Sequence, residues 1–225
     1  MDQIVESDML FGPYPSGHGF RVEDSSPHRA AGEGVKMIEF YKLDLPPGRP
    51  AILWLVEAKR TGPMVDPAKY QKSVELLEKR GGVEFREHAA VFDAFVEFIR
   101  SQGPRLFPLL PSDVDIYFSE LRDKMINGLN LFFATRSGRH PDEEREWPEP
   151  FRNVALGKLQ VRILLVVKTA ELHWLPDLQA ELQKVMRPTI GTLALGPDAI
   201  VVLNEEEAIR RGFIGLAEFC LRAKQ

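Results

Sequence analysis

An apolar segment that ends in alternating charges holds the residues best suited to chemistry. Residues 51–56 are apolar, with Trp54 the one member that carries a polar atom, and Glu57-Ala58-Lys59 follows directly. Flanking Pro50 and Gly62-Pro63 mark this run as a strand buried on both faces. Side chains two residues apart in a strand lie on one face, so Glu57 and Lys59 are predicted to share a face. Burying a carboxylate and an ammonium is costly unless they are paired or bind a cation, which raises the question of a chemical role.

A second carboxylate, that of Glu39, is predicted to face Glu57. Residues 34–44 alternate as a strand does, and Glu39 is the one charged residue among its odd-numbered positions. Residues 45–50 form a turn rich in Pro, so the two strands should make an antiparallel hairpin. Glu39 and Glu57 are equally far from Gly48 along the chain, which places them opposite each other, with Cβ atoms roughly 4.5–5.5 Å apart. A bulge would shift this register and turn Glu39 to the other face.

Two carboxylates that face each other repel, and a divalent cation between them would turn the repulsion into a binding site. Mg²⁺ prefers oxygen ligands and is usually held by one or two carboxylates together with water. Glu39 and Glu57 would supply the carboxylates, and the carbonyl of Ala58 would supply a third oxygen. Bound Mg²⁺ lowers the pKa of its water and clamps phosphate oxygens, as phosphodiester hydrolysis requires. Lys59 is placed to orient the attacking water or to stabilise the developing charge.

The remaining elements predict an α/β fold with a mixed central sheet flanked by helices, because a hairpin is followed by helical crossovers. Residues 1–19 are predicted to be loop, apart from a short strand at 9–11. The other predicted elements are, in order, a strand at 20–23, the hairpin, helices at 66–80 and 84–101, a helix from Ser112 to near Gly138, an exposed loop at 138–153, a strand at 159–168, a helix from Pro176 to Pro188, a strand at 199–203, and a helix capped by Asn204.

The 225 residues are predicted to form a single domain, residues 1–225, with the helical pair as an insertion at about 66–103. The net charge of -4 gives no overall signature of a nucleic-acid binder, so such binding would need a local patch. Cys220 is the only cysteine, which excludes an intramolecular disulfide. The given sequence shows neither a cationic stretch followed by an apolar signal core nor an apolar run near 20 residues. We therefore expect a cytoplasmic protein without a membrane partner.

Glu39, followed eighteen positions later by Glu57-Ala58-Lys59, resembles the PD-(D/E)xK nuclease superfamily with its restriction-endonuclease-like fold. Met37-Ile38-Glu39 stands where the superfamily often carries a Pro-Asp dipeptide. The predicted order from Phe20 to Lys168 is similar to the family core, except that no first helix is found before Phe20. The pattern of Phe20–Asp24, Val35–Glu39 and Val56–Lys59 is also similar to bacterial proteins of the superfamily. This similarity does not indicate a substrate.

The resemblance implies a Mg²⁺- or Mn²⁺-dependent nuclease in which Glu39, Glu57 and Lys59 are catalytic. It implies that Glu39, Glu57 and the Ala58 carbonyl hold the metal ion. The family often takes a further acidic ligand from its first helix, and Glu23 is the candidate for that position here. Nucleic acid, with DNA as the first choice, would be the partner, and the likeness to enzymes that cut both strands allows a homodimer.

An alternative function stays open, that of a catalytically inactive nuclease-fold module which binds nucleic acid or a protein partner. The acidic charge balance and the missing first helix favour it. Two groups of basic residues are candidate phosphate-binding surfaces: Lys59, Arg60, Lys69, Lys72, Lys79 and Arg80, and Arg136, Arg139, His140, Lys158 and Arg162.

Overall fold

The computed structural model describes residues 1–23, 25–32, 34–62, 111–140, 146–196 and 198–215 of the chain. The chain divides into two compact units, one formed by residues 1–62 and 118–225 and the other by residues 63–117. The predicted insertion at about 66–103 falls within the second unit, and both of its predicted helices lie outside the described residues. All described strands belong to the first unit.

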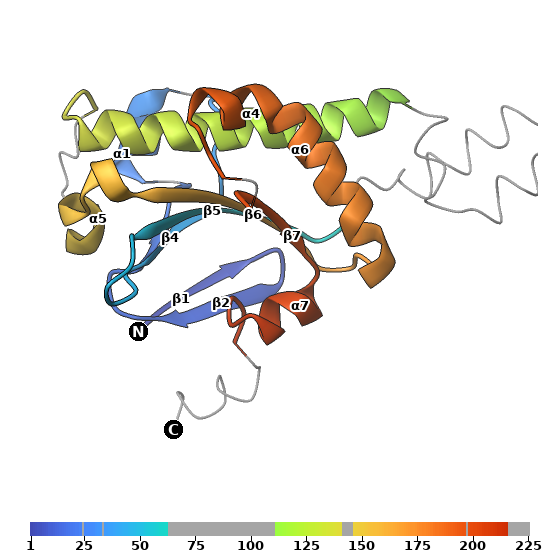
Figure 1. Cartoon of the computed structure of the whole chain (residues 1–225), viewed down its shortest axis with the longest axis horizontal. Helices are drawn as coiled ribbons and strands as arrows, with labels where there is room; N and C mark the ends of the chain where they lie inside the picture. Colours follow the sequence, from blue (N-terminus) through green and yellow to red (C-terminus); the bar gives the residue numbers. More distant parts are fainter. Residues whose placement is uncertain (24, 33, 63–110, 141–145, 197, 216–225) are drawn as a thin grey trace, which may run out of the picture. The chain divides into compact units, whose positions relative to one another are not determined.

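A five-stranded mixed sheet forms the centre of the first unit, with strand order β3-β4-β5-β6-β7 (Figure 1). The strands β3, β4 and β5 are antiparallel neighbours, whereas β5, β6 and β7 run parallel. This arrangement confirms the predicted α/β fold with a mixed central sheet, while a restriction-endonuclease-like core stays a prediction. The bounds are β3 (Gly19–Arg21), β4 (Phe40–Asp44), β5 (Ile52–Lys59), β6 (Gln160–Val167) and β7 (Ile200–Leu203).

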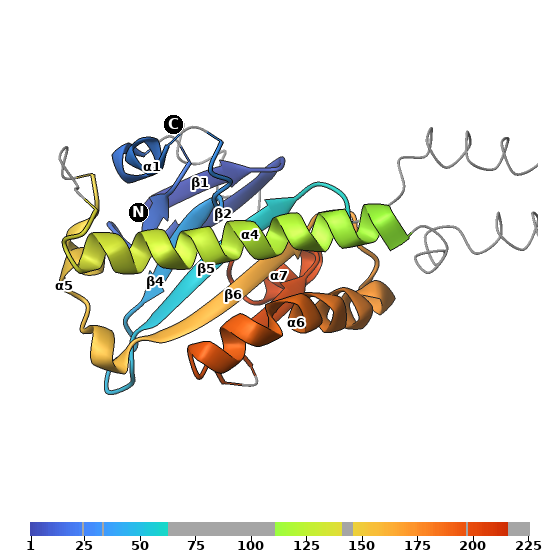
Figure 2. The ribbon, with the colours of Figure 1, turned by 90° about the horizontal axis from the view of Figure 1, so that it is seen from above.

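The two faces of the sheet have different covers (Figures 1 and 2). Helices α4 (Pro111–Arg136) and α6 (Leu175–Thr192) lie over one face, and a hairpin of β1 (Asp2–Glu6) and β2 (Met9–Tyr14) lies over the other, together with α7 (Glu205–Arg210). Trp54, Val56 and Ala58 of β5 share a core cluster with residues of the hairpin and of α7. Because side chains alternate along a strand, Glu57 and Lys59 lie on the face covered by α4.

Strand β2 confirms the short strand predicted at 9–11, whereas β1 corrects the prediction of loop for the residues before it. The two strands pair antiparallel, and Ser7 and Asp8 form the turn with positive φ angles of 50° and 59°. A two-residue hairpin turn with both φ values positive usually carries Asn-Gly or Asp-Gly. Ser7-Asp8 lacks the glycine, so the sequence offers a weak turn signal there.

The strand predicted over residues 34–44 is shorter than expected, because β4 begins at Phe40. The backbone of residues 34–39 finds partners outside the sheet, since Asn127 of α4 donates to the Lys36 carbonyl (2.9 Å). A short helix, α1 (Ser26–Ala31), which was not predicted, lies between β3 and this segment. Helix α4 approaches residues 34–39 closely, because a Cβ atom at Gly128 would lie only 3.1 Å from Ile38.

Several local predictions are confirmed. Strands β6 and β7 and helix α4 form where the apolar patterns place them, and Asn204 caps α7 by accepting a hydrogen bond from the Glu207 backbone (2.9 Å). Pro188 does not end its helix, which continues to Thr192 with Pro188 exposed inside it. Part of the predicted loop at 138–153 is helical. The remaining short elements are α5 (Glu149–Asn153), η3 (Leu156–Lys158) and η4 (Leu172–Trp174).

None of the described helices combines the length and the apolar character that crossing a membrane requires.

Candidate active site

The hairpin of β4 and β5 has the register that the sequence predicts. Phe40 pairs with Val56 and Leu43 with Leu53, which is the register symmetric about Gly48. Glu39 directly precedes β4, and the same register extended by one residue places it opposite Glu57. No bulge interrupts the ladder between β4 and β5, so the register is not shifted.

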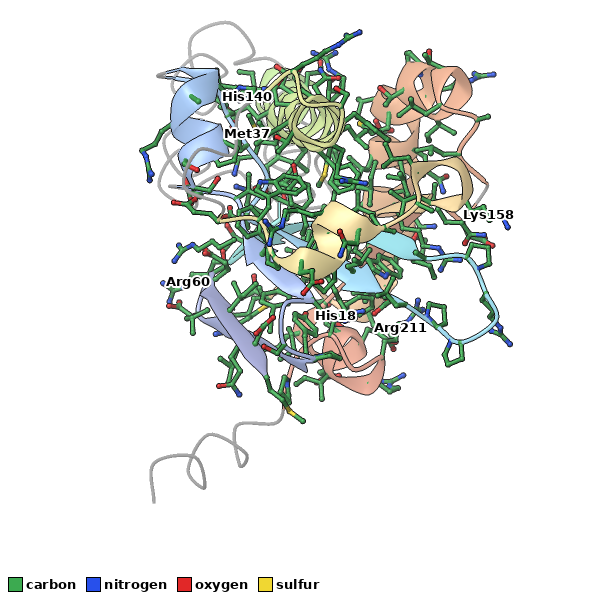
Figure 3. The ribbon with its side chains drawn as sticks, turned by 90° about the vertical axis from the view of Figure 1, so that its left-hand side faces the viewer. His18, Met37, Arg60, His140, Lys158 and Arg211 are labelled. Atoms are coloured by element: carbon green, nitrogen blue, oxygen red, sulfur yellow. The ribbon has the colours of Figure 1, made fainter. Side chains whose placement is uncertain are left out.

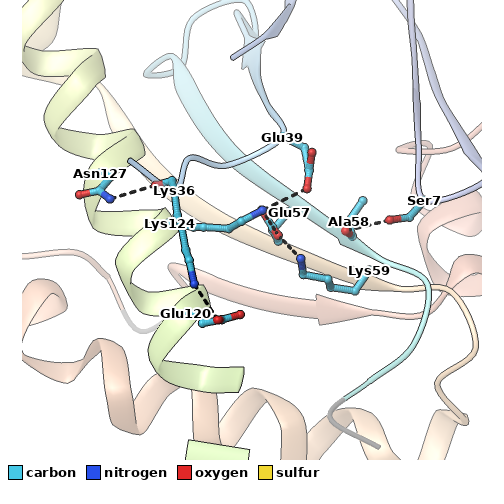
Figure 4. Close-up of polar contacts among 9 residues, drawn as sticks. All are labelled: Ser7, Lys36, Glu39, Glu57, Ala58, Lys59, Glu120, Lys124 and Asn127. Carbon is cyan, nitrogen blue, oxygen red and sulfur yellow. Dashed lines mark hydrogen bonds and ion pairs between the residues drawn. The ribbon is translucent and has the colours of Figure 1, made fainter. Parts of the chain in front are cut away.

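The carboxylates of Glu39 and Glu57 meet at the ammonium group of Lys124 from α4 (Figure 4). Lys124 Nζ lies 2.8 Å from Glu57 Oε1 and 3.2 Å from Glu39 Oε1. Lys59 Nζ also lies 2.8 Å from Glu57 Oε1. Both acids and both ammonium groups therefore lie together at the carboxyl end of β5, where the sequence predicts a site.

Glu57 is the most deeply buried member of this cluster. Its residue is 0% exposed, whereas the side chain of Lys59 is 32% exposed. Burial raises the pKa of Glu57, against the opposing charges of Lys59 and Lys124. Within the described part of the chain, the second oxygen, Oε2, is buried and makes no hydrogen bond. Glu57 thus keeps one buried oxygen free to accept a ligand.

Lys124 is the residue that sequence reasoning missed. Burial disfavours its charged form, but the carboxylates of Glu57 and Glu39 together raise the pKa of Lys124. A signal was present, since Lys124 lies between Leu121 and Met125, both buried on the face of α4 that packs on the sheet. A lysine inside an apolar helical stripe requires an anionic partner, which the hairpin supplies.

The carbonyl of Ala58 lies at the same end of β5, and Ser7 from the turn of the N-terminal hairpin donates a hydrogen bond to it (3.0 Å). A carbonyl oxygen has two lone pairs, so this bond leaves it able to accept a second partner. The carbonyl predicted to be the third oxygen ligand is therefore held in place by the turn of the N-terminal hairpin.

Glu23 and Glu6 differ from what the sequence suggests. Glu23 follows β3 and is exposed, and its charge is felt at Glu6 rather than at Glu57. Glu6 ends β1, lies 2.7 Å from Arg21, and has a side chain that is 12% exposed. Burial and the nearby charge of Glu39 raise the pKa of Glu6. Of the two, Glu6 is the acid that lies beside Glu39.

Within the described ranges, no three His, Cys, Asp or Glu side chains lie close enough together to hold a metal ion by themselves. Mg²⁺ does not require three, because one or two carboxylates with water usually hold it. Glu39, Glu57 with its free Oε2 and the Ala58 carbonyl are oxygen donors of the kind that Mg²⁺ and Mn²⁺ prefer. These residues fit a divalent ion in their chemistry, although Lys124 contacts both carboxylates from α4.

The second group of basic residues, which begins with Arg136, does not form one continuous surface patch. Arg136 donates to the Val154 carbonyl (2.9 Å), and the guanidinium of Arg162 lies over the ring of Trp54 (5.3 Å). Figure 3 shows His140 and Lys158 far apart on the molecule. Arg136 and Arg162 therefore hold local structure, and His140 and Lys158 do not share a patch. Most of the first group lies outside the described residues.

The fold and the site thus define a mixed α/β protein with a buried carboxylate and lysine cluster at the end of a central strand. Comparisons with protein-family models, with curated proteins and with solved structures find no match for this chain. The geometry of the cluster therefore has to support any proposal on function.

Proposed function

We propose that this protein is a metal-dependent nuclease that hydrolyses phosphodiester bonds of nucleic acid. The main supporting observation is the convergence of Glu39, Glu57 and Lys59 at the end of β5, with Glu57 fully buried and its Oε2 unpartnered. Burial opposes the charge of Glu57 even with both lysines beside it, as its raised pKa indicates, so the position is costly to the fold.

The residues have distinct roles in this proposal. Glu39, Glu57 and the carbonyl of Ala58 would hold Mg²⁺ or Mn²⁺. The bound ion would supply Lewis acidity and an activated water molecule. Lys59 keeps its ammonium against Glu57 on the more exposed side of the cluster, where it can donate to a phosphate oxygen or to the attacking water. Ser7 fixes the direction of the Ala58 carbonyl.

A cleavage assay tests the proposal with duplex DNA, single-stranded DNA, branched DNA and RNA, each with Mg²⁺ and with Mn²⁺. We expect cleavage of at least one substrate, and a loss of about 10²–10⁴-fold in Glu57→Gln and in Lys59→Met, in line with the usual contribution of a positioned catalytic group. Glu120→Gln and Lys36→Met are matched controls, because these exposed residues pair with each other (2.6 Å) beside the cluster. Both controls should retain activity.

Two results would contradict the nuclease proposal. Intact substrate across the whole panel with both metals is one. Cleavage that persists unchanged in folded Glu57→Gln is the other, because it would come from a different site or from a contaminant.

A specific observation favours the second candidate, an inactive module that binds nucleic acid or a protein partner. Lys59 and Lys124 together balance the charges of Glu39 and Glu57, so the cluster is neutral without a metal ion. Such a module would give no Mn²⁺-linked stabilisation that depends on Glu39 or Glu57. A thermal-shift titration with Mn²⁺ separates the two candidates before any substrate is known.

A further inference from the structure

We propose that the ammonium of Lys124 is an internal cation which holds the two carboxylates in the metal-free protein and is displaced when a divalent ion binds. The displaced ammonium would then be available to the phosphate of the substrate. The inference rests on the proposed function, because it concerns the same carboxylates. In this proposal a residue of α4, which lies outside the motif of Glu57 and Lys59, controls metal binding.

The contacts of Lys124 support this exchange. Its Nζ lies 2.8 Å from Glu57 Oε1 and 3.2 Å from Glu39 Oε1, so one cation bridges the two carboxylates that face each other across the hairpin. A metal ion bound by both carboxylates would take the same bridging position. Glu57 Oε2 is buried and makes no hydrogen bond among the described residues, so a bound ion would give this oxygen a partner as well.

Electrostatics favour exchange over simultaneous binding. Two carboxylates and two ammonium groups are balanced in this cluster, and a divalent ion added to all four would leave an excess of two positive charges among buried groups. Charges a few ångströms apart at low dielectric repel strongly, so one ammonium has to move away. Lys124 contacts both carboxylates, whereas Lys59 contacts only Glu57 among the groups of this cluster. Lys124 is therefore the ammonium that blocks the bridge.

The Lys124 side chain can leave without movement of α4. It is 17% exposed and carries its charge on a flexible four-carbon stem, so rotation about side-chain bonds brings the ammonium toward solvent. The backbone of α4 is held nearby by two other contacts, from Tyr41 Oη to the Gly128 carbonyl (2.6 Å) and from Asn127 to the Lys36 carbonyl (2.9 Å).

Calorimetric titration of the full chain with Mn²⁺ tests the exchange, because it reads metal binding without activity. Lys124→Met removes the competing cation, and we expect it to bind Mn²⁺ about 10- to 100-fold more tightly than the wild type, as expected from the loss of charge-assisted hydrogen bonds that the metal otherwise has to break. Lys36→Met is the matched control, since it removes one positive charge beside the cluster without touching Glu39 or Glu57, and its affinity should stay within about twofold.

Two further measurements keep the test decisive if Lys124→Met does not fold. Lys124→Gln keeps a hydrogen-bond donor but no charge, and it should also bind Mn²⁺ more tightly. In the wild type, the ammonium resonance of Lys124 in ¹⁵N-lysine NMR should shift on saturation with Mg²⁺, whereas that of Lys36 should not.

The outcomes separate the two proposals. Equal Mn²⁺ affinity in wild type and both Lys124 variants, or an unchanged Lys124 resonance at saturation, overturns the exchange and leaves the metal site standing. Binding by the Lys124 variants alone supports the exchange but contradicts metal-dependent activity of the wild type. Absence of binding in all variants overturns both proposals.

Discussion

Replacement of Glu57 by glutamine should leave the metal-free protein at least as stable as the wild type while abolishing stabilisation by metal. Glutamine has nearly the shape of glutamate, so the change removes charge and leaves the packing of a fully buried side chain intact. Its amide oxygen can still accept a hydrogen bond from Lys59 or Lys124, whose ammonium groups each lie 2.8 Å from Glu57 Oε1.

The sign of the expected change follows from the raised pKa of Glu57. Burial is the largest cause, and it outweighs the lowering effect of the two lysines, so the carboxylate is less favoured in the folded protein than in the unfolded chain. A carboxyl group with a higher pKa in the folded protein binds more protons when folded. The free energy of unfolding of the wild type therefore decreases as the pH rises from about 4.5 through the raised pKa of Glu57. Glu57→Gln should lack this decrease.

Two free energies distinguish a metal-binding carboxylate from a structural one: the cost of the substitution without metal, and the stabilisation by bound metal. Removing one partner of a buried structural ion pair typically costs about 3–5 kcal/mol. A metal ion at a hundredfold excess over its dissociation constant stabilises the folded state by about 2.7 kcal/mol. For a protein of this size that stabilisation corresponds to a rise in melting temperature of about 5–10 °C. We expect this rise in the wild type and none in Glu57→Gln.

Urea unfolding without metal and thermal unfolding with and without Mn²⁺ measure the two quantities. Glu120→Gln is the control, because it removes an exposed carboxylate of α4 and should keep the Mn²⁺ response. If metal-free Glu57→Gln loses about 3–5 kcal/mol, Glu57 is a structural partner of the lysines and the reasoning is refuted.

Three further predictions concern the elements that position the cluster. Gly128→Ala should lose up to about 2 kcal/mol in urea unfolding, because crowding against Ile38 (3.1 Å) exceeds the gain in helix propensity. Ile38→Ala removes all three crowding atoms and should relieve the contact, with a coupling of at least about 0.5 kcal/mol in a double-mutant cycle. Asn204→Ala should cost about 1–2 kcal/mol in the same assay, because the cap on Glu207 is lost, whereas an unchanged midpoint would contradict that role. The stability difference between wild type and Lys124→Met should be constant from pH 7 to 10 and shrink only above pH 10.5, since the raised pKa of Lys124 keeps its charge up to that point. A difference that shrinks near neutral pH would refute the last prediction.

The part of the site that the hairpin forms was predictable from sequence. The apolar run of β5 and the Pro-rich turn are local signals, and the turn fixes the register that brings Glu39 opposite Glu57. Strand β6 and the buried face of α4 follow from equally local patterns. These signals act over a few residues, so a single sequence carries them fully.

The partners that complete the cluster could not be predicted in this way. Lys124 reaches Glu39 across 85 positions of sequence, and Ser7 reaches Ala58 across 51. Such contacts depend on how helix and hairpin pack on the sheet, which periodicity does not specify. The lysine within the stripe of α4 shows that a partner is needed but does not say which one.

The contact of Lys124 with both carboxylates is compatible with both candidate functions. The two functions differ in what they imply for Oε2 of Glu57. A purely structural ion pair in a fully buried position should satisfy both carboxylate oxygens, because an unsatisfied buried charged acceptor costs about 1–3 kcal/mol or more. Both ammonium groups instead lie 2.8 Å from Oε1, and Oε2 makes no hydrogen bond within the part of the chain that the structure describes. A fold that only needed to neutralise Glu57 would gain stability from any donor at Oε2. A divalent ion bound at this carboxylate would give Oε2 a partner, and this is the physical reason for proposing the metal-dependent site ahead of the inactive module.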